Sequence, residues 1–480
     1  MSSRHAAPVL LLTVVAACLP DNPSDTDTTE TGAATGTTDD TPTGGPATGL
    51  FACDSPPCTL VLVSQTLDDR VDIYDADTRG LRGRIDLDLK RDSTGKQLGV
   101  LLDEPYDLAL TPTDLLVTLG HYPDTDRGSL LRFPRGDFAD LAPGDIFPAS
   151  RYFNTASLVF DGDVQPLTHA RLEGIFLLPH PSGRVLIGVF ANDLKSTAEN
   201  WMTPSEVLVF DPEDLDVADL GSFSLGGLDV PCIGGWRLEP LNAEVSKVGV
   251  ACDGSKSIAV LTLPDDFATA SPADAAAGIT GCGNSLLGGA STITQFISSD
   301  GDGGLLAVQS DLLQAPRLAS FRDDCTLVAY SKSPPDELAD IKLLRQPVLA
   351  RPASDGDPIW LIASALPATL VVARGGGIPE LCGRVDLGGA IDPVNAPWAL
   401  ALNGAGDHLA IGTGPLNEPQ QGLGTGQVLW GALDRASLAT CKPTLTDVVD
   451  LNQDLFVASD PTTWVRAPNV IRVVEIGGDA

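Results

Sequence analysis

The stretch WALALNGAGDHLAI, residues 398–411, aligns without a gap on GIFLLPHPSGRVLI, residues 174–187. Both segments consist of an apolar run, a polar turn containing Gly or Pro, and a second apolar run, which is the pattern of two strands joined by a hairpin turn. The pattern predicts a β unit that recurs along the chain. Looser copies of its first strand begin near Tyr106, Trp236, Thr294, Arg345 and Trp464.

A further element of the unit is visible in LRGRIDL, residues 81–87, and LCGRVDL, residues 381–387. Each follows a predicted strand, which ends at Tyr74 in one copy and at Ala373 in the other. The copies start roughly 50 to 70 residues apart, more than the ~40–45 residues of a minimal four-stranded blade, so the connections must be long. The surplus falls in stretches rich in Pro, Gly and Asp at residues 123–128, 192–204 and 412–426.

Short strands at regular spacing, together with 49 Gly and 37 Pro, predict an all-β closed array. The strand-turn-strand VLVSQTLDDRVDIYD, residues 61–75, is similar to those of bacterial β-propellers of the YVTN and NHL kind. This resemblance implies the architecture and no particular function.

The two ends of the folded region are each incomplete. Residues 59–88 supply outer strands without a preceding inner strand, and residues 454–476 supply strands without a complete blade after them. Joining the two makes one blade from both chain ends, which removes the open edge of the array. We therefore expect a β-propeller of seven four-stranded blades, with six or eight as the alternatives.

The N-terminal segment predicts export. An apolar run over residues 6–19 is too short to span a bilayer and follows a weakly positive start. It contains VAAC, residues 15–18, which resembles the lipobox of bacterial lipoproteins. The resemblance implies cleavage before Cys18 and attachment of acyl chains such as palmitate, and Leu19 after it points to the outer membrane. The alternative is an ordinary signal peptidase site.

Residues 21–50 contain ten Thr, six acidic residues and no Lys or Arg, so they cannot bury enough apolar surface to fold. A disordered linker is expected, and a Thr-rich glycosylated stalk is the alternative. The predicted organisation is a signal peptide at 1–17, the lipidated cysteine with its linker at 18–50, and the propeller domain at 51–480.

The negative net charge of the chain excludes some classes of partner. With 64 acidic and 30 basic residues, the net charge is −34, which makes nucleic acid and bare anionic lipid poor partners. The expected partners are the membrane, through the lipid anchor, and an envelope protein or a carbohydrate.

Eight cysteines remain beyond Cys18, and an even number in an exported chain predicts disulfides. Candidate pairs are Cys53 with Cys58 and Cys232 with Cys252. Bonds within a blade or to an inserted loop are expected over bonds between blades, because equivalent points on neighbouring blades diverge at the rim. That expectation covers Cys282, Cys325, Cys382 and Cys441.

Four of the seven predicted inner strands begin with a large aromatic residue. Such rings would lie near one mouth of the central channel and could stack on a sugar or another flat ligand. The alternative is that the rings wedge between adjacent blades. The four residues are Tyr106, Trp236, Trp398 and Trp464.

The run Asp300–Gly304 has the oxygen density of a calcium loop but lacks the acidic residue that an EF-hand needs, so a hairpin turn is expected. No metal, cofactor or catalytic residue is predicted, because the chain has no nucleophile elbow, phosphate-binding loop, zinc-protease motif or paired Cys/His nucleophile.

The function expected from these observations is that of an envelope lipoprotein whose propeller binds or scaffolds a protein or a carbohydrate. The alternative is a propeller enzyme of the hydrolase, lactonase or dehydrogenase type. That alternative requires polar side chains from several blades, such as Asp107, Glu173, Arg237 and Arg345, to converge on one substrate position.

Overall fold

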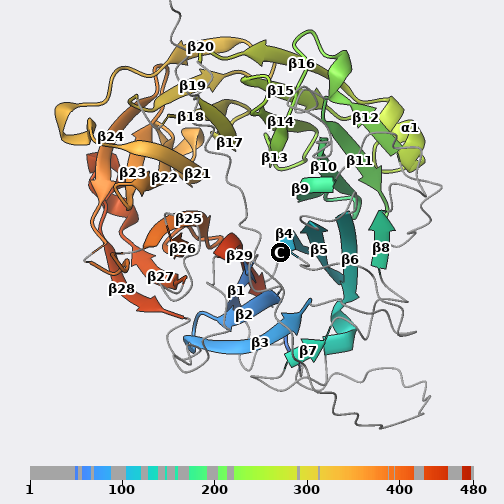
Figure 1. Ribbon diagram of the computed structural model, residues 1–480, viewed down its shortest axis with the longest axis horizontal. Helices are drawn as coiled ribbons and strands as arrows, with labels where there is room; N and C mark the ends of the chain where they lie inside the picture. Colours follow the sequence, from blue (N-terminus) through green and yellow to red (C-terminus); the bar gives the residue numbers. More distant parts are fainter. Residues whose placement is uncertain are drawn as a thin grey trace, which may run out of the picture.

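The computed structural model describes sixteen stretches of the chain, and they form seven sheets arranged in a ring around a central axis, which we call the channel (Figure 1). The described residues are 49–51, 57–65, 70–87, 104–120, 128–138, 146–148, 157–160, 172–191, 204–212, 221–288, 292–311, 314–387, 389–393, 395–415, 426–451 and 468–476. The prediction of an all-β propeller with seven four-stranded antiparallel blades is confirmed.

Each blade is given from its inner to its outer strand. Blade 1 is built from β29 (Pro468–Ile476), β1 (Cys58–Gln65), β2 (Arg70–Asp75) and β3 (Gly80–Asp86). Blade 2 is built from β4 (Glu104–Leu110), β5 (Asp114–Gly120), β6 (Gly128–Pro134) and β8 (Ser157–Phe160). Blade 3 is built from β9 (Leu172–Pro179), β10 (Val185–Ala191), β11 (Glu206–Phe210) and β12 (Gly221–Ser224).

The remaining blades repeat this order. Blade 4 is built from β13 (Gly235–Pro240), β14 (Lys247–Cys252), β15 (Ser257–Thr262) and β16 (Thr280–Ser285). Blade 5 is built from β17 (Ile293–Ser299), β18 (Leu305–Ser310), β19 (Arg317–Phe321) and β20 (Leu327–Tyr330). Blade 6 is built from β21 (Lys342–Arg351), β22 (Ile359–Leu366), β23 (Thr369–Arg374) and β24 (Glu380–Val385). Blade 7 is built from β25 (Asn395–Leu402), β26 (His408–Pro415), β27 (Val428–Leu433) and β28 (Leu445–Asp450).

The two chain ends close the ring as predicted. β29 pairs antiparallel with β1, from Cys58 opposite Ile476 to Gln65 opposite Pro468. The pair is fixed further by Ser64, whose hydroxyl accepts a hydrogen bond from the Val470 amide at 3.0 Å. Because the inner strand of blade 1 comes from the C-terminus and its other strands from the N-terminus, β1 is paired on both sides and blade 1 has an inner strand like every other blade.

The burial pattern explains why these sequences form strands. Middle strands are packed on both faces by neighbouring blades, so they are buried along their length: all six residues of β18 are buried, and four of them are apolar. Outer strands face solvent on one side and alternate, as β24 does. The described part of the chain holds six apolar clusters, each containing residues of two neighbouring blades, so the core lies between the blades.

Two further elements join the blades at the rim, and sequence reasoning missed them. The short strand β7 (Ile146–Pro148) pairs in parallel with β3 and gives blade 1 a fifth strand. The helix α1 (Pro272–Ala277) begins at Ser271, whose hydroxyl accepts from the Asp274 amide, and it contacts β11 and β12 of blade 3. None of the helices in the described residues is long and apolar enough to cross a membrane.

The disulfides correct one expectation. Cys232 is bonded to Cys252, as the sequence suggested, and both belong to blade 4 and the segment before it. The other two bonds join neighbouring blades: Cys282 of β16 reaches Cys325 of blade 5, and Cys382 of β24 reaches Cys441 of blade 7. The expectation of bonds within a blade was therefore wrong for these four cysteines.

The physical reason is the close approach of the outer strand to the next blade. The Cα atoms of Cys382 and Cys441 are 5.6 Å apart, and a Cβ on Gly383 would lie only 1.6 Å from the carbonyl oxygen of Cys441. The parallel bridge between Asp386 and Thr444 continues the same contact. Cys58 is also disulfide-bonded, and Cys53, its predicted partner, lies outside the described residues.

Candidate functional site

All seven inner strands carry a β-bulge near their first residues. At each bulge the inner strand has one residue more than the strand beside it, so the ladder is interrupted and the side chains are redirected. Because the blades share one topology, the seven bulges lie at the same end of the channel, which we call the bulge mouth. They fall at or beside Tyr106, Ile175, Trp236, Thr294, Arg345, Trp398 and Asn469.

The bulge mouth is where the sequence placed its candidate aromatic residues. The Trp236 ring lies 6.0 Å from the ring of Phe176 on the preceding blade, a tilted contact between neighbouring inner strands. Tyr106 occupies the bulge of β4 and is partly exposed. Trp398 occupies the bulge of β25, and Trp464 lies outside the described residues. The structure therefore distributes the described rings around the mouth, one to a blade.

Trp398 forms a pair with Arg345, which sits at the bulge of the adjacent inner strand. The guanidinium carbon of Arg345 lies 4.2 Å from the centre of the Trp398 ring, a close cation–π contact. Both side chains are partly exposed, but Nε of Arg345 and Nε1 of Trp398 are buried and donate to no acceptor in the described part of the chain. Burial lowers the pKa of Arg345 to about 10, so the group remains charged at neutral pH.

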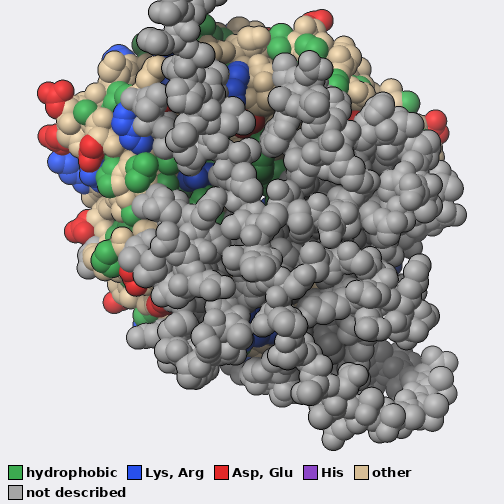
Figure 2. Space-filling model, in the orientation of Figure 1, with side chains coloured by type: hydrophobic (Ala, Val, Ile, Leu, Met, Phe, Trp, Pro, Cys, Tyr) green, Lys and Arg blue, Asp and Glu red, His purple; other side chains and the backbone are tan. Residues whose placement is uncertain are grey.

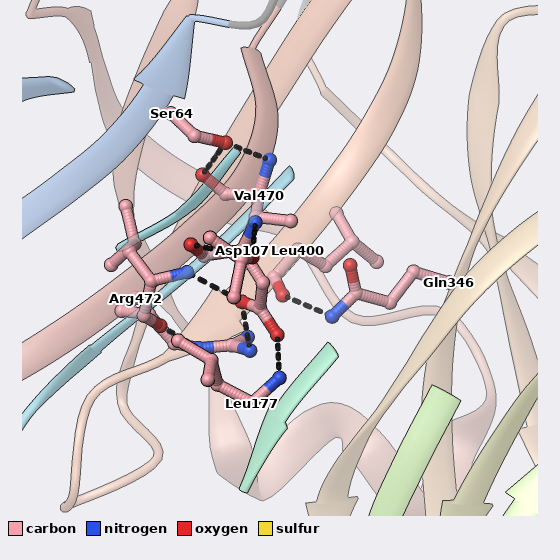
Figure 3. A network of polar contacts seen from close by, with 9 residues as sticks. Ser64, Asp107, Leu177, Gln346, Leu400, Val470 and Arg472 are labelled. Atoms are coloured by element: carbon pink, nitrogen blue, oxygen red, sulfur yellow. Dashed lines mark hydrogen bonds and ion pairs between the residues drawn. The ribbon is translucent and has the colours of Figure 1, made fainter. Parts of the chain in front are cut away.

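Deeper in the channel, Asp107 joins three blades (Figure 3). Its carboxylate accepts from the amide of Leu177 on blade 3 at 3.0 Å and from Arg472 on blade 1 at 2.7 Å. It also accepts from the amide of Leu108 next to it. The side chain of Asp107 is 2% exposed, whereas that of Arg472 is 28% exposed. Asp107 is thus a structural carboxylate, while part of the Arg472 side chain remains open.

Arg237 and Glu239 are two residues apart on β13, so their side chains lie on the same face of the strand. The charges of Asp107 and Arg472 act on Arg237 as well. Burial lowers the pKa of Arg237, and the charge of Arg472 lowers it further. Burial raises the pKa of Glu239, against the charge of Arg237 and hydrogen bonds from the Ser299 amide and the Ser298 hydroxyl. Both side chains stay partly exposed although protein surrounds them, as expected for residues of a channel wall.

Another polar contact fixes the strands beneath the Arg345–Trp398 pair. Gln346, beside Arg345 in the bulge, is buried and donates through Nε2 to the carbonyl oxygen of Leu400 at 3.1 Å (Figure 3). The bulges of β21 and β25 are therefore held at a fixed separation. This contact keeps the guanidinium and the indole stacked.

The four polar side chains that a channel enzyme would need do not converge on one position in the described residues. Arg237 and Asp107 influence each other electrostatically, so two of the four suggested side chains are brought together. Asp107 is occupied by three donors, and the side chain of Glu173 lies outside what the structure describes. Arg345 pairs with Trp398 instead.

Glu239, Arg472 and Ser298 belong to this channel cluster and were missed from the sequence. The available signal was their position, since each is a polar residue inside an otherwise strand-like segment such as WRLEP or VIRVVE. A charge in such a segment is costly unless it faces a partner or water. Only the closed ring shows that these segments face one another.

Two surface hollows at the opposite ends of the inner strands contain none of these residues. One, of about 360 Å³, lies between blades 5 and 6 beside Asp300, Arg322 and Trp360. The other, of about 340 Å³, lies between blades 7 and 1 beside Asn403 and His408.

The run Asp300–Gly304 forms the turn between β17 and β18, as expected. One carboxylate oxygen of Asp300 accepts from the amides of Asp302 and Gly304, both at 2.8 Å. Gly301 and Gly303 have φ angles of 80° and 89°. Glycine adopts positive φ angles readily because it has no Cβ, and the turn requires them here. No group of three or more potential metal ligands occurs among the described residues.

No family model matches the chain, and no curated protein matches it. Several solved structures are similar to it at low identity. A putative 6-phosphogluconolactonase from Bacteroides fragilis is 11% identical, with a TM-score of 0.48 over 87% of this chain and 98% of the other. The periplasmic gluconolactonase PpgL of Pseudomonas aeruginosa is 12% identical, with a TM-score of 0.46 over 87% and 99%. AztD from Citrobacter koseri is 12% identical, with a TM-score of 0.39 over 88% and 100%. Likenesses this distant bear on neither activity nor ligand.

Proposed function

We propose that this chain is an exported lipoprotein whose propeller binds a carbohydrate at the bulge mouth without turning it over. The observation that carries the proposal is Trp398, an indole whose buried N–H donates to no acceptor among the described residues. A partly exposed aromatic ring whose N–H has no protein acceptor offers a ring face for the apolar side of a sugar and an unused donor for a hydroxyl oxygen.

The surrounding scaffold supports a binding role. The Gln346–Leu400 hydrogen bond and the buried Asp107 junction hold the inner strands in place, so the mouth is rigid before a ligand arrives. A preformed site avoids the cost of ordering side chains on binding. The lone pairs of Asp107 are already used by the protein, which disfavours a role for it as a catalytic base.

The ligand part of the proposal is tested on the full chain, purified in detergent and applied to an array of glycans. We expect binding to a defined subset of glycans, and loss of that binding in Trp398→Ala. The matched control is Trp430→Phe in the same blade, because Trp430 stacks on His408 away from the channel. Failure of every glycan to bind, or equal binding by the two variants, would contradict the proposal.

The anchor is a separate part of the proposal and rests on the sequence VAAC at residues 15–18. Several acyl chains on Cys18 would hold the protein at a membrane without a spanning helix. Growth of the producing cells with an alkyne fatty acid should label the native chain and leave Cys18→Ala unlabelled. Labelling of both chains, or of neither, would overturn the anchor without affecting the glycan result.

A further inference from the structure

Resting on the proposed carbohydrate site, we infer that its ligand is an acidic saccharide whose carboxylate is bound by Arg345 at the edge of the Trp398 ring. The inference concerns the chemical class of the ligand, and it depends on three observations. They are the missing partner of Arg345, the geometry of its stack, and the balance of charges in the channel.

The first observation is that Arg345 forms no hydrogen bond or ion pair with any described residue. Other arginines are paired: Arg84 with Asp72 at 2.7 Å, and Arg132 with Asp114 at 2.8 Å. In a chain with twice as many acids as bases, an arginine without an acid beside it is not explained by a shortage of partners. Burying a cation without an anion is costly, and proteins keep such costs at sites where a ligand supplies the missing charge.

The second observation is the stack itself. The guanidinium of Arg345 lies over the Trp398 ring, which covers one side of the group, and the planar fork of N–H donors has no acceptor at Nε among the described residues. That arrangement matches a planar carboxylate, which accepts two parallel N–H bonds from one guanidinium. Nε1 of Trp398 adds a neutral donor beside the charged ones. An oxyanion with a sugar ring attached would therefore use both members of the pair.

The third observation is the sign of the net charge that these side chains carry. Among the channel side chains named above, three are arginines and two are acids, and Arg472 already neutralises Asp107. The protein that surrounds Glu239 raises its pKa, which favours its neutral form. The balance is positive inside a protein of net charge −34, so a small anion is drawn from an acidic surface into a basic channel. The arginines are Arg237, Arg345 and Arg472.

The test is isothermal titration of the full chain in detergent with two disaccharides that differ in one group, a terminal glucuronate or a terminal glucose. We expect the acidic sugar to bind at least tenfold more tightly, and we expect Arg345→Gln to abolish this preference while the neutral sugar still binds. The matched control is Arg384→Gln on the outer strand β24, whose partner is Asp340 at the rim. That variant should keep the preference.

Each other outcome separates the two proposals. Equal affinities for the two sugars would overturn the inference and leave the carbohydrate site standing, whereas no binding of either sugar would overturn the proposed function. Inorganic phosphate is titrated as a third probe, and tighter binding of phosphate than of the acidic sugar would overturn the choice of a saccharide carboxylate. If Arg345→Gln fails to fold, the same titrations of the native protein at increasing salt test the inference. The affinity for the acidic sugar must fall with added salt, and the affinity for the neutral sugar must not.

Discussion

At the scale of single residues, the structure depends on polar groups that join blades inside the channel. Asp107 is the clearest case, because one carboxylate receives donors from blades 1, 2 and 3. Asp107→Ala would leave the Leu177 amide without its acceptor and Arg472 without its partner. We expect a loss of about 3–5 kcal/mol in the free energy of unfolding.

The measurement is urea unfolding followed by tryptophan fluorescence. The matched control is Asp302→Ala, which removes an exposed carboxylate from the β17–β18 turn and should change stability by less than about 0.5 kcal/mol. Similar losses in both variants would show that the Asp107 junction contributes little.

Glu239 predicts a pH dependence of the opposite kind to that of a paired acid. Burial raises its pKa in the folded state, so the unfolded chain releases this proton first as the pH rises. The resulting stability is fully present below the ordinary glutamate pKa of about 4.5 and is lost as the pH rises through the raised value.

Glu239→Gln removes this titration and keeps an oxygen that can accept from the Ser299 amide. The variant should therefore gain stability relative to the native protein as the pH rises above the ordinary glutamate pKa, as followed by urea midpoints at each pH. A difference between the two proteins that does not change with pH would refute the assignment.

Residue by residue, the sequence predicted positions better than roles. Trp236 and Trp398 were found because they begin repeat units, and the structure places both at bulges. The role of Arg345 could not be predicted, since its partner Trp398 is 53 positions away and the two meet only when blades 6 and 7 pack together. Arg472 meets Asp107 for the same reason, across the closed ring.

At the scale of elements, the outer strands are bonded to the following blade. Cys382 and Cys441 are 59 positions apart, and opening that loop costs about 4 kcal/mol in the chain-entropy account. We expect the double variant Cys382→Ser with Cys441→Ser to lose up to about 4 kcal/mol of unfolding free energy.

Peptide mapping without reduction is the direct check on the pairing itself. It should recover Cys282 joined to Cys325 and Cys382 joined to Cys441. A peptide joining Cys282 to Cys382 would contradict the contact between outer strands and neighbouring blades. The double variant Cys232→Ser with Cys252→Ser is the control, since its loop of 20 positions predicts a smaller loss of about 3 kcal/mol.

The sequence predicted the order of the strands within the blades. It did not predict which strands contact a neighbouring blade. The segments 81–87 and 381–387 do correspond, since β3 and β24 are the outer strands of their blades. The disulfides between blades were missed because a sequence repeat shows which positions of the blades are equivalent. It does not show how close an outer strand comes to the next blade. The short strand β7 gave no signal, because three residues are too few for an alternation to show.

At the scale of the whole molecule, the ring depends on β29. This strand supplies the inner edge of blade 1 and contacts β25 and β4 on either side. Without it, β1 would face the channel with an open edge, and the apolar surfaces of blades 1, 2 and 7 would be exposed. Removing residues 468–480 should abolish cooperative unfolding and cause aggregation.

Calorimetry and size-exclusion chromatography would follow the effect. The control is removal of residues 477–480 alone, which leaves β29 whole. A truncated chain that keeps a single sharp transition would contradict closure through β29. A count of seven blades requires that the two chain ends form one blade together. The sequence predicted this closure because each end contains an incomplete repeat unit.

If Arg345 serves a ligand and not the fold, replacing it should leave the free energy of unfolding of the protein almost unchanged. Arg345→Met removes a charge that has no described ion-pair partner and keeps much of the packing against Trp398. We expect the variant to have a stability within about 1 kcal/mol of the native protein, or above it, because the lost cation–π contact is offset by the relieved burial of a charge. A loss of about 3 kcal/mol or more, as expected for a structural arginine such as Arg84 with its partner Asp72, would contradict it.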